Sequence, residues 1–366
     1  MHAGPNSAAS GGDGGQSPGF AFGTIVIASH SGRLAQLGEH RVRNAGVEGS
    51  NPSSSTKNLL EMSTGPKNIG FVGFGEAAFH IAGGLRTSGI EEIAAYDINT
   101  WTPGLGEKIR QRAAETGTRL VDSNGELTGL SRIILSTVTA NQALAAAQQT
   151  APGLSAGHIY ADLNSVSPGL KQSIGRVISA AGAKYVEVAV MAPVPPYGHQ
   201  VPMLVGGPGG AEFIERMKPF GMQMEYTSAN VGEAAATKMC RSIVVKGMEA
   251  LLTECVLGAT RYGAEARVFK SLAESFPGLD WARMATYMVG RVVVHGERRA
   301  REMEEVVETL RSMGVEPMMA EATVRRMDWS AQLGLKKLFG GEAPASHREF
   351  ADAIAELDVQ IIGKPT

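Results

Sequence analysis

The 366-residue chain has little of several features that mark particular classes of protein. It contains only two cysteines, and only 6% of its residues are aromatic. Its formal net charge is −2 at pH 7, and acids and bases are mixed along the chain, which speaks against nucleic-acid binding. No apolar run reaches the roughly 18 residues that a membrane-spanning helix needs. With 43% hydrophobic residues, the composition fits two globular domains with a substantial core.

The two cysteines, Cys240 and Cys255, fall in one stretch that is rich in helix-forming residues. On a single rigid helix they lie about four turns apart, too far from each other to form a disulfide. Without a disulfide framework, a cytoplasmic location is the simpler expectation. The eight histidines form no His-Glu-x-x-His motif and no cluster with the cysteines, so we expect no metal site.

The stretch around these cysteines runs without proline from Asn230 to Tyr262. Asn230 is a suitable N-cap and Gly263 a suitable helix stop, so we expect one helix of roughly 30 residues, about 45 Å long. A helix of that length outruns one small domain. It predicts a connection between a first half, where strand and helix patterns alternate, and a second half that has helical patterns only.

Residues 1–63 differ in composition from the rest of the chain. They begin with a Gly/Ser-rich segment, which cannot bury enough apolar surface to order itself. Residues 33–58 resemble a tRNA gene read as protein, which makes Met62 the expected first residue of the native chain. We therefore expect residues 1–63 to be a disordered or non-native extension without a function of its own.

Residues 68–89 combine an apolar strand pattern, a glycine turn and a helix pattern. Positions 73–78, Gly-Phe-Gly-Glu-Ala-Ala, fit the Gly-x-Gly-x-x-Ala fingerprint of dinucleotide-binding folds. The first glycine permits a tight turn, and the second lets a pyrophosphate approach the amides at the positive end of the helix. The loop residues expected to bind a cofactor are Gly73, Phe74, Gly75, Glu76 and Ala77.

A second strand pattern ends in Asp97, about 22 residues after Gly75. An acid at this place binds the ribose hydroxyls of adenosine and repels a 2′-phosphate, and the next residue, Ile98, offers no guanidinium. These features favour NAD over NADP, and NADP stays open as the alternative. A structural glycine turn beside a solvated Asp97 is the competing interpretation.

Further strand patterns, separated by helical ones, lie at 132–138, 158–163, 183–190 and 202–207. This alternation predicts a largely parallel, doubly wound sheet, which binds ligands at the carboxyl ends of its strands. In the loops expected there, Val138 is a candidate cofactor contact, and Asn164 and Ser165 are candidate substrate contacts. Ser167, directly before Pro168, is the pattern of a helix N-cap.

Four separated motifs together resemble the β-hydroxyacid dehydrogenase and 6-phosphogluconate dehydrogenase superfamily. They are the glycine fingerprint, DLNSVSP at 162–168, the segment 187–207 and GEAAATKMCRS at 232–242. The C-terminal part of the chain resembles a less characterised branch of this superfamily. The resemblance implies an α/β fold, with an N-terminal Rossmann doubly wound sheet that binds NAD(P) at 64–229. An all-α substrate and dimerisation domain at 230–366 is expected to follow, joined by the long interdomain helix.

The same resemblance places Lys238 on the catalytic lysine of the superfamily. Three departures from the family pattern affect the substrate side, because Met191-Ala192-Pro193, Asn164-Ser165 and Ser242 replace its usual residues. Arg241 shares the helix face of Lys238. It either binds a substrate carboxylate or faces solvent, and the sequence leaves both interpretations open.

Hydride transfer between nicotinamide and an alcohol carbon needs a proton acceptor beside the hydroxyl. A lysine serves if burial among apolar neighbours lowers its pKa toward neutrality. We therefore expect Lys238 to be the general acid/base for a small-molecule substrate, oriented by Ser242 and by Asn164 or Ser165. A second lysine on this helix, Lys246, is expected to be an ordinary surface lysine.

Helical patterns continue to the end of the chain, at 265–275, 280–290, 292–313, 317–335 and 346–361. His295 and Arg298 are candidates for contact with a substrate anion, whereas Arg299 and Arg301 are expected on a solvated face. One face of the long helix is apolar and consists of Met248, Leu251, Leu252 and Val256. The families that this chain resembles form dimers through these helices, so we predict a homodimer.

Three functions remain in competition at this point. The first is an NAD(P)-dependent oxidoreductase acting on a small hydroxy acid or related alcohol. The second is an imine reductase of the same architecture, against which Lys238 speaks because a basic lysine is dispensable there. The third is a dinucleotide-binding sensor without turnover, supported by the altered segment Met191-Ala192-Pro193.

Overall fold

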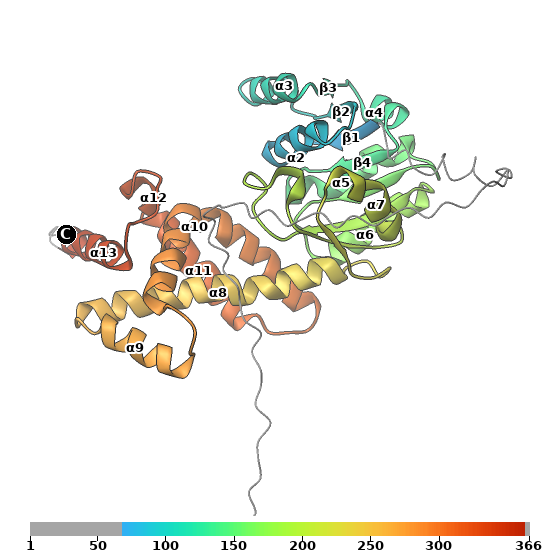
Figure 1. Ribbon diagram of the computed structural model, residues 1–366. Helices are drawn as coiled ribbons and strands as arrows, with labels where there is room; N and C mark the ends of the chain where they lie inside the picture. Colours follow the sequence, from blue (N-terminus) through green and yellow to red (C-terminus); the bar gives the residue numbers. More distant parts are fainter. Residues whose placement is uncertain (1–67, 363–366) are drawn as a thin grey trace, which may run out of the picture. The chain divides into compact units, whose positions relative to one another are not determined.

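The computed structural model describes residues 68–362, with side chains to residue 357. The expectation for residues 1–63 therefore lies outside the described residues. Within them, strands and helices alternate as far as β8, and only helices follow (Figure 1). This order confirms the α/β class, with a Rossmann-type sheet first and an all-helical region after it.

One eight-stranded sheet organises the first half, in the order β3-β2-β1-β4-β5-β6-β7-β8. All neighbouring strands pair in parallel except β6 and β7, which are antiparallel. The strands are β1 Asn68–Val72, β2 Glu92–Tyr96, β3 Arg119–Leu120, β4 Ile133–Ser136, β5 Ile159–Asp162, β6 Lys184–Val190, β7 Met203–Gly206 and β8 Met224–Tyr226. The predicted sheet is thus confirmed as largely parallel.

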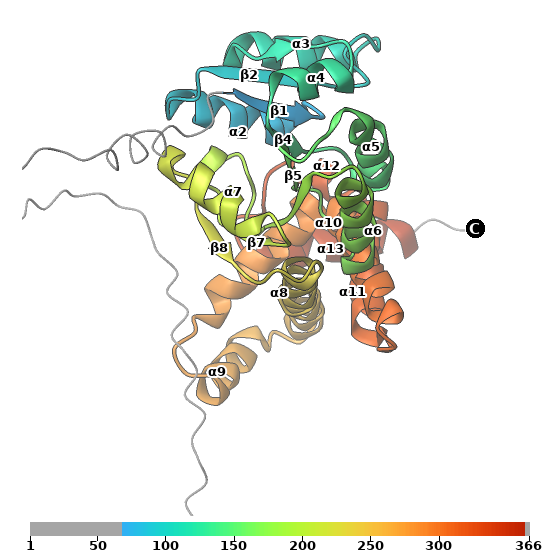
Figure 2. The ribbon, with the colours of Figure 1, turned by 90° about the vertical axis from the view of Figure 1, so that its right-hand side faces the viewer.

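Helices cover both faces of the sheet, because alternate side chains of each buried strand point to opposite sides. Phe71 of β1 packs into a core shared with α2, α3 and α7, whereas its neighbour Val72 packs into a second core with α4, α5 and α6. Figure 2 shows α6 and α7 on opposite sides of the strands. The helices are α2 Glu76–Thr87, α3 Leu105–Thr116, α4 Asn124–Leu130, α5 Ala143–Thr150, α6 Pro168–Ala180 and α7 Gly210–Met217.

The long helix expected after the sheet is α8, which runs from Glu233 to Arg261 over 29 residues. Its N-cap is Gly232, not Asn230 as the sequence suggested. The reason is tertiary: the fully buried carboxylate of Glu187 in β6 accepts hydrogen bonds from the backbone N–H groups of Gly232 and Ala235, both at 2.6 Å. A side chain from the sheet therefore performs the capping that a local residue was expected to perform.

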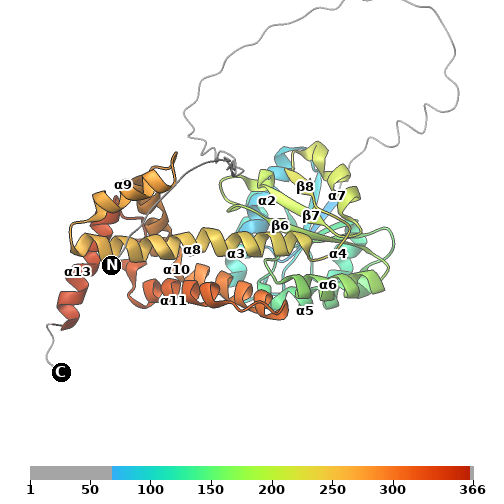
Figure 3. The same cartoon turned by 90° about the horizontal axis from the view of Figure 1, so that it is seen from below.

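The second half consists of α8 together with α9 Glu265–Ser275, α10 Trp281–Ser312, α11 Met318–Gln332, α12 Leu335–Leu338 and α13 His347–Ile362. α8 lies alongside α10 and α11 (Figure 3). The sequence predicted two helices where α10 is one. Gly290, near the expected break, lies inside α10, where a Cβ atom would approach Ala343 to 2.9 Å. This glycine allows close packing of the chain and does not end the helix.

Both cysteines lie on α8 and are free thiols, Cys240 exposed and Cys255 partly buried. No helix between residues 68 and 362 is long and apolar enough to cross a membrane. The homodimer stays a prediction. Of the face on which it depended, Leu252 and Val256 pack inside the core of this chain, and Leu251 is exposed.

Because Glu187 caps α8, we expect its substitution to cause a measurable loss of stability. Replacing Glu187 with alanine leaves two buried amides without an acceptor, so we expect a loss of about 2–4 kcal/mol in the free energy of unfolding. Glu187→Gln keeps one acceptor oxygen and should lose less. Chemical denaturation measures both. Glu225→Ala, an exposed glutamate on β8, is the control, and an equal loss there would contradict the capping role.

Candidate functional site

The glycine loop after β1 is held in place by the neighbouring strands. Gly73 has a φ of 83°, and a Cβ atom there would approach the Thr137 carbonyl oxygen to 2.9 Å. The carboxylate of Asp97, at the end of β2, accepts from the Phe74 N–H at 2.7 Å and from the Asn99 N–H at 2.8 Å. Asp97 therefore fixes the turn as well as facing the space above it.

A pocket of about 390 Å³ opens over this loop. It contains four of the seven predicted cofactor contacts, namely Gly73, Gly75, Asp97 and Val138. The other three do not line it: Phe74 is buried in the core, Glu76 is exposed in the first turn of α2, and Ala77 follows it. Phe74 and Glu76 belong to the glycine fingerprint, but their side chains are not part of the pocket wall.

The pocket has the features that a dinucleotide needs. No side chain caps the N-terminus of α2, so its first amides are free to hold a pyrophosphate, and the space beside Gly75 is open. Asp97 is the only charged residue among those that line the pocket, and the exposed Ile98 adjoins it. No described side chain there supplies a cation for a 2′-phosphate.

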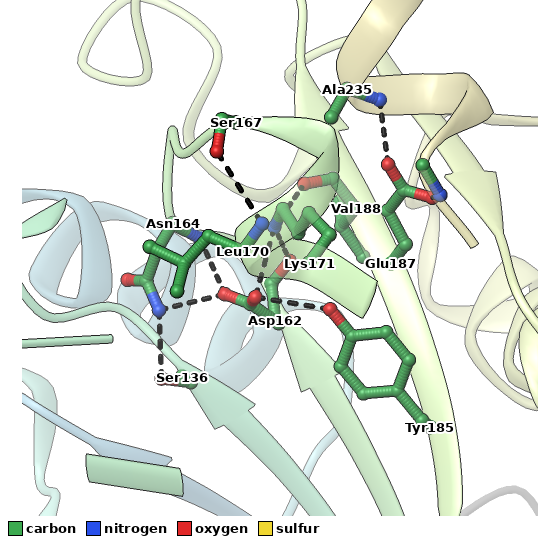
Figure 4. A network of polar contacts seen from close by, with 11 residues as sticks. Ser136, Asp162, Asn164, Ser167, Leu170, Lys171, Tyr185, Glu187, Val188 and Ala235 are labelled. Atoms are coloured by element: carbon green, nitrogen blue, oxygen red, sulfur yellow. Dashed lines mark hydrogen bonds and ion pairs between the residues drawn. The ribbon is translucent and has the colours of Figure 1, made fainter. Parts of the chain in front are cut away.

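Beneath the loop after β5 lies a buried network around Asp162 (Figure 4). Its carboxylate accepts from the ammonium of Lys171 at 3.1 Å and from the Tyr185 hydroxyl at 3.1 Å. The same ammonium donates to the backbone carbonyl of Asp162 at 2.7 Å. Burial, followed by the charge of Asp162, raises the pKa of Tyr185 well above its usual value. The loop thus rests on a fully paired internal charge.

Asn164 belongs to this network. Its amide nitrogen donates to Asp162 at 2.7 Å and to the Ser136 hydroxyl at 3.0 Å, whereas its carbonyl oxygen is buried and without a partner (Figure 4). The predicted substrate contact Asn164 is thus placed beneath the loop. Its neighbour Ser165 reaches a second pocket, and Ser167 caps α6 by accepting from the Leu170 N–H, as predicted. Asn164 therefore joins the end of β4, next to the first pocket, to the edge of the second.

The second pocket, of about 190 Å³, lies between α8, α10 and the loops after β5 and β6. It brings together the predicted residues Ser165, Lys238, Arg241 and Ser242. Its other lining residues are Val190, Met191, Ala192, Pro193, Met239, Val245, Lys246, Arg291, Arg298, Arg299 and Glu302. Five of the side chains in that list are charged, and of these only Arg298 was anticipated from the sequence as a contact for an anion.

Lys238 is the residue of this pocket whose pKa is shifted. Burial lowers its pKa to about 8; the charge of Glu302 opposes this effect, and those of Lys171 and Lys246 add to it. Among the described residues, no side chain or carbonyl forms a hydrogen bond or ion pair with its amine. A lysine held near neutrality without a partner is suited to accept and donate a proton.

Two basic residues expected at the surface are buried instead. Lys246 donates to the Ser242 hydroxyl at 3.0 Å and pairs with Glu302 at 3.2 Å. Arg299 pairs at 2.9 Å with Glu249, a fully buried carboxylate that also binds Arg291 at 3.0 Å. Helical spacing offered a signal, because positions 238, 242 and 246 share one face of α8.

The remaining candidates, His295 and Arg298, share one pocket, and only Arg298 also lines the pocket of Lys238. Arg298 lines the second pocket and pairs with Glu302 at 2.6 Å. His295 lines a neighbouring pocket with Lys336, and burial together with the charge of Arg298 lowers its pKa. Of this pair, only Arg298 can therefore meet a ligand beside Lys238.

Comparison with known proteins agrees with this architecture. Residues 259–330 match the model of a domain of unknown function, DUF1932. A conserved hypothetical protein from Sinorhizobium meliloti is 40% identical in sequence; the similarity covers 74% of this chain and 90% of that one, with a TM-score of 0.65. A second conserved protein, whose structure is described as similar to 3-hydroxyacid dehydrogenases, is 28% identical over 73% of this chain and 99% of that one, with a TM-score of 0.62.

Among curated proteins, the mitochondrial 3-hydroxyisobutyrate dehydrogenase of Drosophila melanogaster is 28% identical over 223 residues, which are 60% of this chain and 66% of that one. The fold, the glycine loop and these relatives together define the class. The chain belongs to the β-hydroxyacid dehydrogenase superfamily, in a branch whose C-terminal helical domain matches DUF1932.

Glu302, the single carboxylate that lines the second pocket, offers a way to change the pKa of Lys238 in a known direction. Because the charge of Glu302 raises this pKa, Glu302→Gln should lower it further below about 8. An NMR titration of lysine side chains, with Lys238→Met used to assign the signal, measures the change. Glu304→Gln is the control, since Glu304 pairs with Arg301 on the same helix and does not line the pocket. An unchanged pKa in Glu302→Gln would contradict the assigned cause.

Proposed function

We propose that this protein is an NAD-dependent oxidoreductase that transfers a hydride between nicotinamide and a small hydroxy acid or related alcohol. The observation that carries the proposal is Lys238, an amine with a pKa near 8 and without a partner among the described residues. Its pocket lies at the carboxyl ends of β5 and β6, and the glycine-loop pocket of dinucleotide type lies at the carboxyl ends of β1, β2 and β4 in the same sheet. The superfamily and the dehydrogenase among its relatives support this reaction class.

The residues of the first pocket fit a dinucleotide. The free amides of α2 would hold the pyrophosphate, and Asp97 would accept from the adenosine ribose hydroxyls. The bound nicotinamide supplies a hydride acceptor in alcohol oxidation and a hydride donor in the reverse direction. Asp97 and the absence of a cation among the lining residues favour NAD, and NADP is the alternative.

In the oxidation, the neutral amine of Lys238 would accept the proton of the substrate hydroxyl as the hydride leaves the carbon that bears this hydroxyl. In the reduction, its ammonium would polarise the carbonyl and return the proton. Arg241, which lines the pocket and has no ion pair among the described residues, would bind a substrate carboxylate, and Ser165 and Ser242 would orient the hydroxyl. Asn164 supports Ser165 from beneath.

Cofactor preference gives the first experiment. Fluorescence titration of the protein should find tighter binding of NADH than of NADPH, because a 2′-phosphate would meet Asp97 without a compensating cation. Ile98→Arg should raise the affinity for NADPH by about tenfold through a charge-assisted contact. Leu105→Arg, at another exposed apolar position outside the pocket, is the control. Failure of both dinucleotides to bind would remove the basis of the proposal.

The proposed role of Lys238 gives the second experiment. With a panel of hydroxy acids and NAD, Lys238→Met should reduce kcat by roughly 10²–10⁴ and leave NADH affinity nearly unchanged. In the wild type, kcat/KM for oxidation should rise with pH through about 8, since the neutral amine is the base, and kcat/KM for reduction should fall over the same range.

Lys270→Met, on an exposed position of α9, is the matched control. Cofactor binding without turnover on any hydroxy acid would favour the sensor. Turnover of an imine that survives Lys238→Met would favour the imine reductase.

A further inference from the structure

The second pocket holds more positive charge than one carboxylate of a substrate can balance. Six cationic side chains and a single carboxylate, Glu302, line it. The cationic residues are Lys238, Arg241, Lys246, Arg291, Arg298 and Arg299. Like charges gathered in a partly buried space repel one another strongly unless an anion joins them.

The protein itself neutralises only part of this charge. Glu302 is shared between Arg298 and Lys246, and Glu249, behind the pocket wall, is shared between Arg291 and Arg299. Lys238 and Arg241 take part in no ion pair among the described residues. In addition, the Nε of Arg299 is buried and has no hydrogen-bond partner. Donors therefore remain unused at both ends of the pocket.

These donors lie at two separate levels along α8. Lys238 and Arg241 are near the Rossmann-type sheet, where Ser165 and Met191 also line the pocket. The backbone of Lys246 lies two helical turns further on, about 12 Å along the axis, and its ammonium reaches back to the Ser242 hydroxyl and to Glu302 of α10. Arg291 and Arg299 of α10 contact Glu249, which lies a further turn beyond Lys246 on α8. One small carboxylate cannot serve both levels at once.

We infer that the substrate of the proposed reaction carries a second anionic group, a phosphoryl, phosphonyl or second carboxylate group. The hydroxyl and a first carboxylate lie at the level of Lys238 and Arg241, and the second anion binds at the level of Lys246, Arg291 and Arg298. Glu302, bound to two of these cations, occupies part of the space of that second anion and competes with it. The inference rests on the proposed function, because it treats this pocket as the substrate site.

The test uses three ligands that share the –CH2–CH2–COO⁻ unit and differ in the terminal group, namely butyrate (methyl), succinate (carboxylate) and 3-phosphonopropionate (phosphonate). Calorimetric titration of the protein should give at least tenfold tighter binding of one or both dianionic ligands than of butyrate. The stronger of the two identifies the second group as a carboxylate or a phosphonate. Equal affinity for all three ligands would overturn the inference.

Variants on α10 locate the second anion. Arg298→Gln should reduce the preference for the dianion to near that for butyrate, whereas Glu302→Gln should tighten dianion binding, because the internal competitor is removed. Arg301→Gln is closely matched: Arg298 and Arg301 have side chains 58% and 56% exposed, each pairs with a glutamate within one turn, and Arg301 does not line the pocket. An equal loss in Arg301→Gln would mean only a general effect of charge and would overturn the inference.

An NADH titration of the same protein separates this inference from the proposed function. NADH binding without discrimination among the three ligands would overturn the second anion and leave the proposed function standing. Dianion binding without NADH binding would overturn the proposed function, and with it the assignment of the dianion as a substrate. NADH binding together with a dianion preference that Arg298→Gln removes supports both.

Discussion

The carboxylate of Glu187 determines where the candidate acid/base lies. It extends from β6 to the first amides of α8, so that one buried side chain joins the sheet to the helix that carries the second pocket. Lys238 follows Ala235 by less than one helical turn. Burial raises the pKa of Glu187, and the two amides and Lys171 oppose that rise. Its position is therefore fixed by hydrogen bonds to a helix N-terminus, where a carboxylate also meets the positive end of the dipole.

Paired charges lie behind the second pocket in both halves of the described chain. Asp162 and Lys171 support the loop that carries Ser165, and Glu249 holds Arg291 and Arg299 at the wall of the second pocket. Buried pairs of this kind are weak contributors to stability, since desolvation consumes most of their attraction. Their geometric effect is larger, because each fixes the direction of a side chain or loop that faces a ligand.

Local patterns explain why so much of the fold could be predicted. The glycine turn and the Ser167–Pro168 cap are determined by residues close in sequence, and the structure places both as expected. The short elements β3 and β8 were missed because two or three residues carry no periodic signal. The break expected near Gly290 was wrong because that glycine serves a contact with Ala343, more than fifty residues away.

The same distinction holds in the candidate site. A motif in the sequence points to Lys238, but not to its environment, because most of the charges that act on its pKa come from other helices: Glu302 and Arg298 from α10, and Lys171 from α6. Lys246 and Arg299 look like solvated residues of an amphipathic helix until α8 and α10 are brought together. Spacing on one helix indicates which residues share a face, but only the packing of the two helices shows that both faces meet.

The charges that prepare the second pocket for an anion also lower the pKa of Lys238, so the two properties are coupled. Lys246 and Arg298 both disfavour the ammonium of Lys238 in the free protein. An anion bound among them would favour the ammonium, and by linkage a protonated Lys238 would favour the anion. The free protein therefore holds the amine closest to neutrality, and an anionic substrate would raise its pKa on entering. In the proposed oxidation, a tightly bound dianion would make Lys238 a stronger base but a less frequently deprotonated one. Glu302 acts in the same direction as such an anion, since its negative charge already raises the pKa of Lys238 before a substrate arrives.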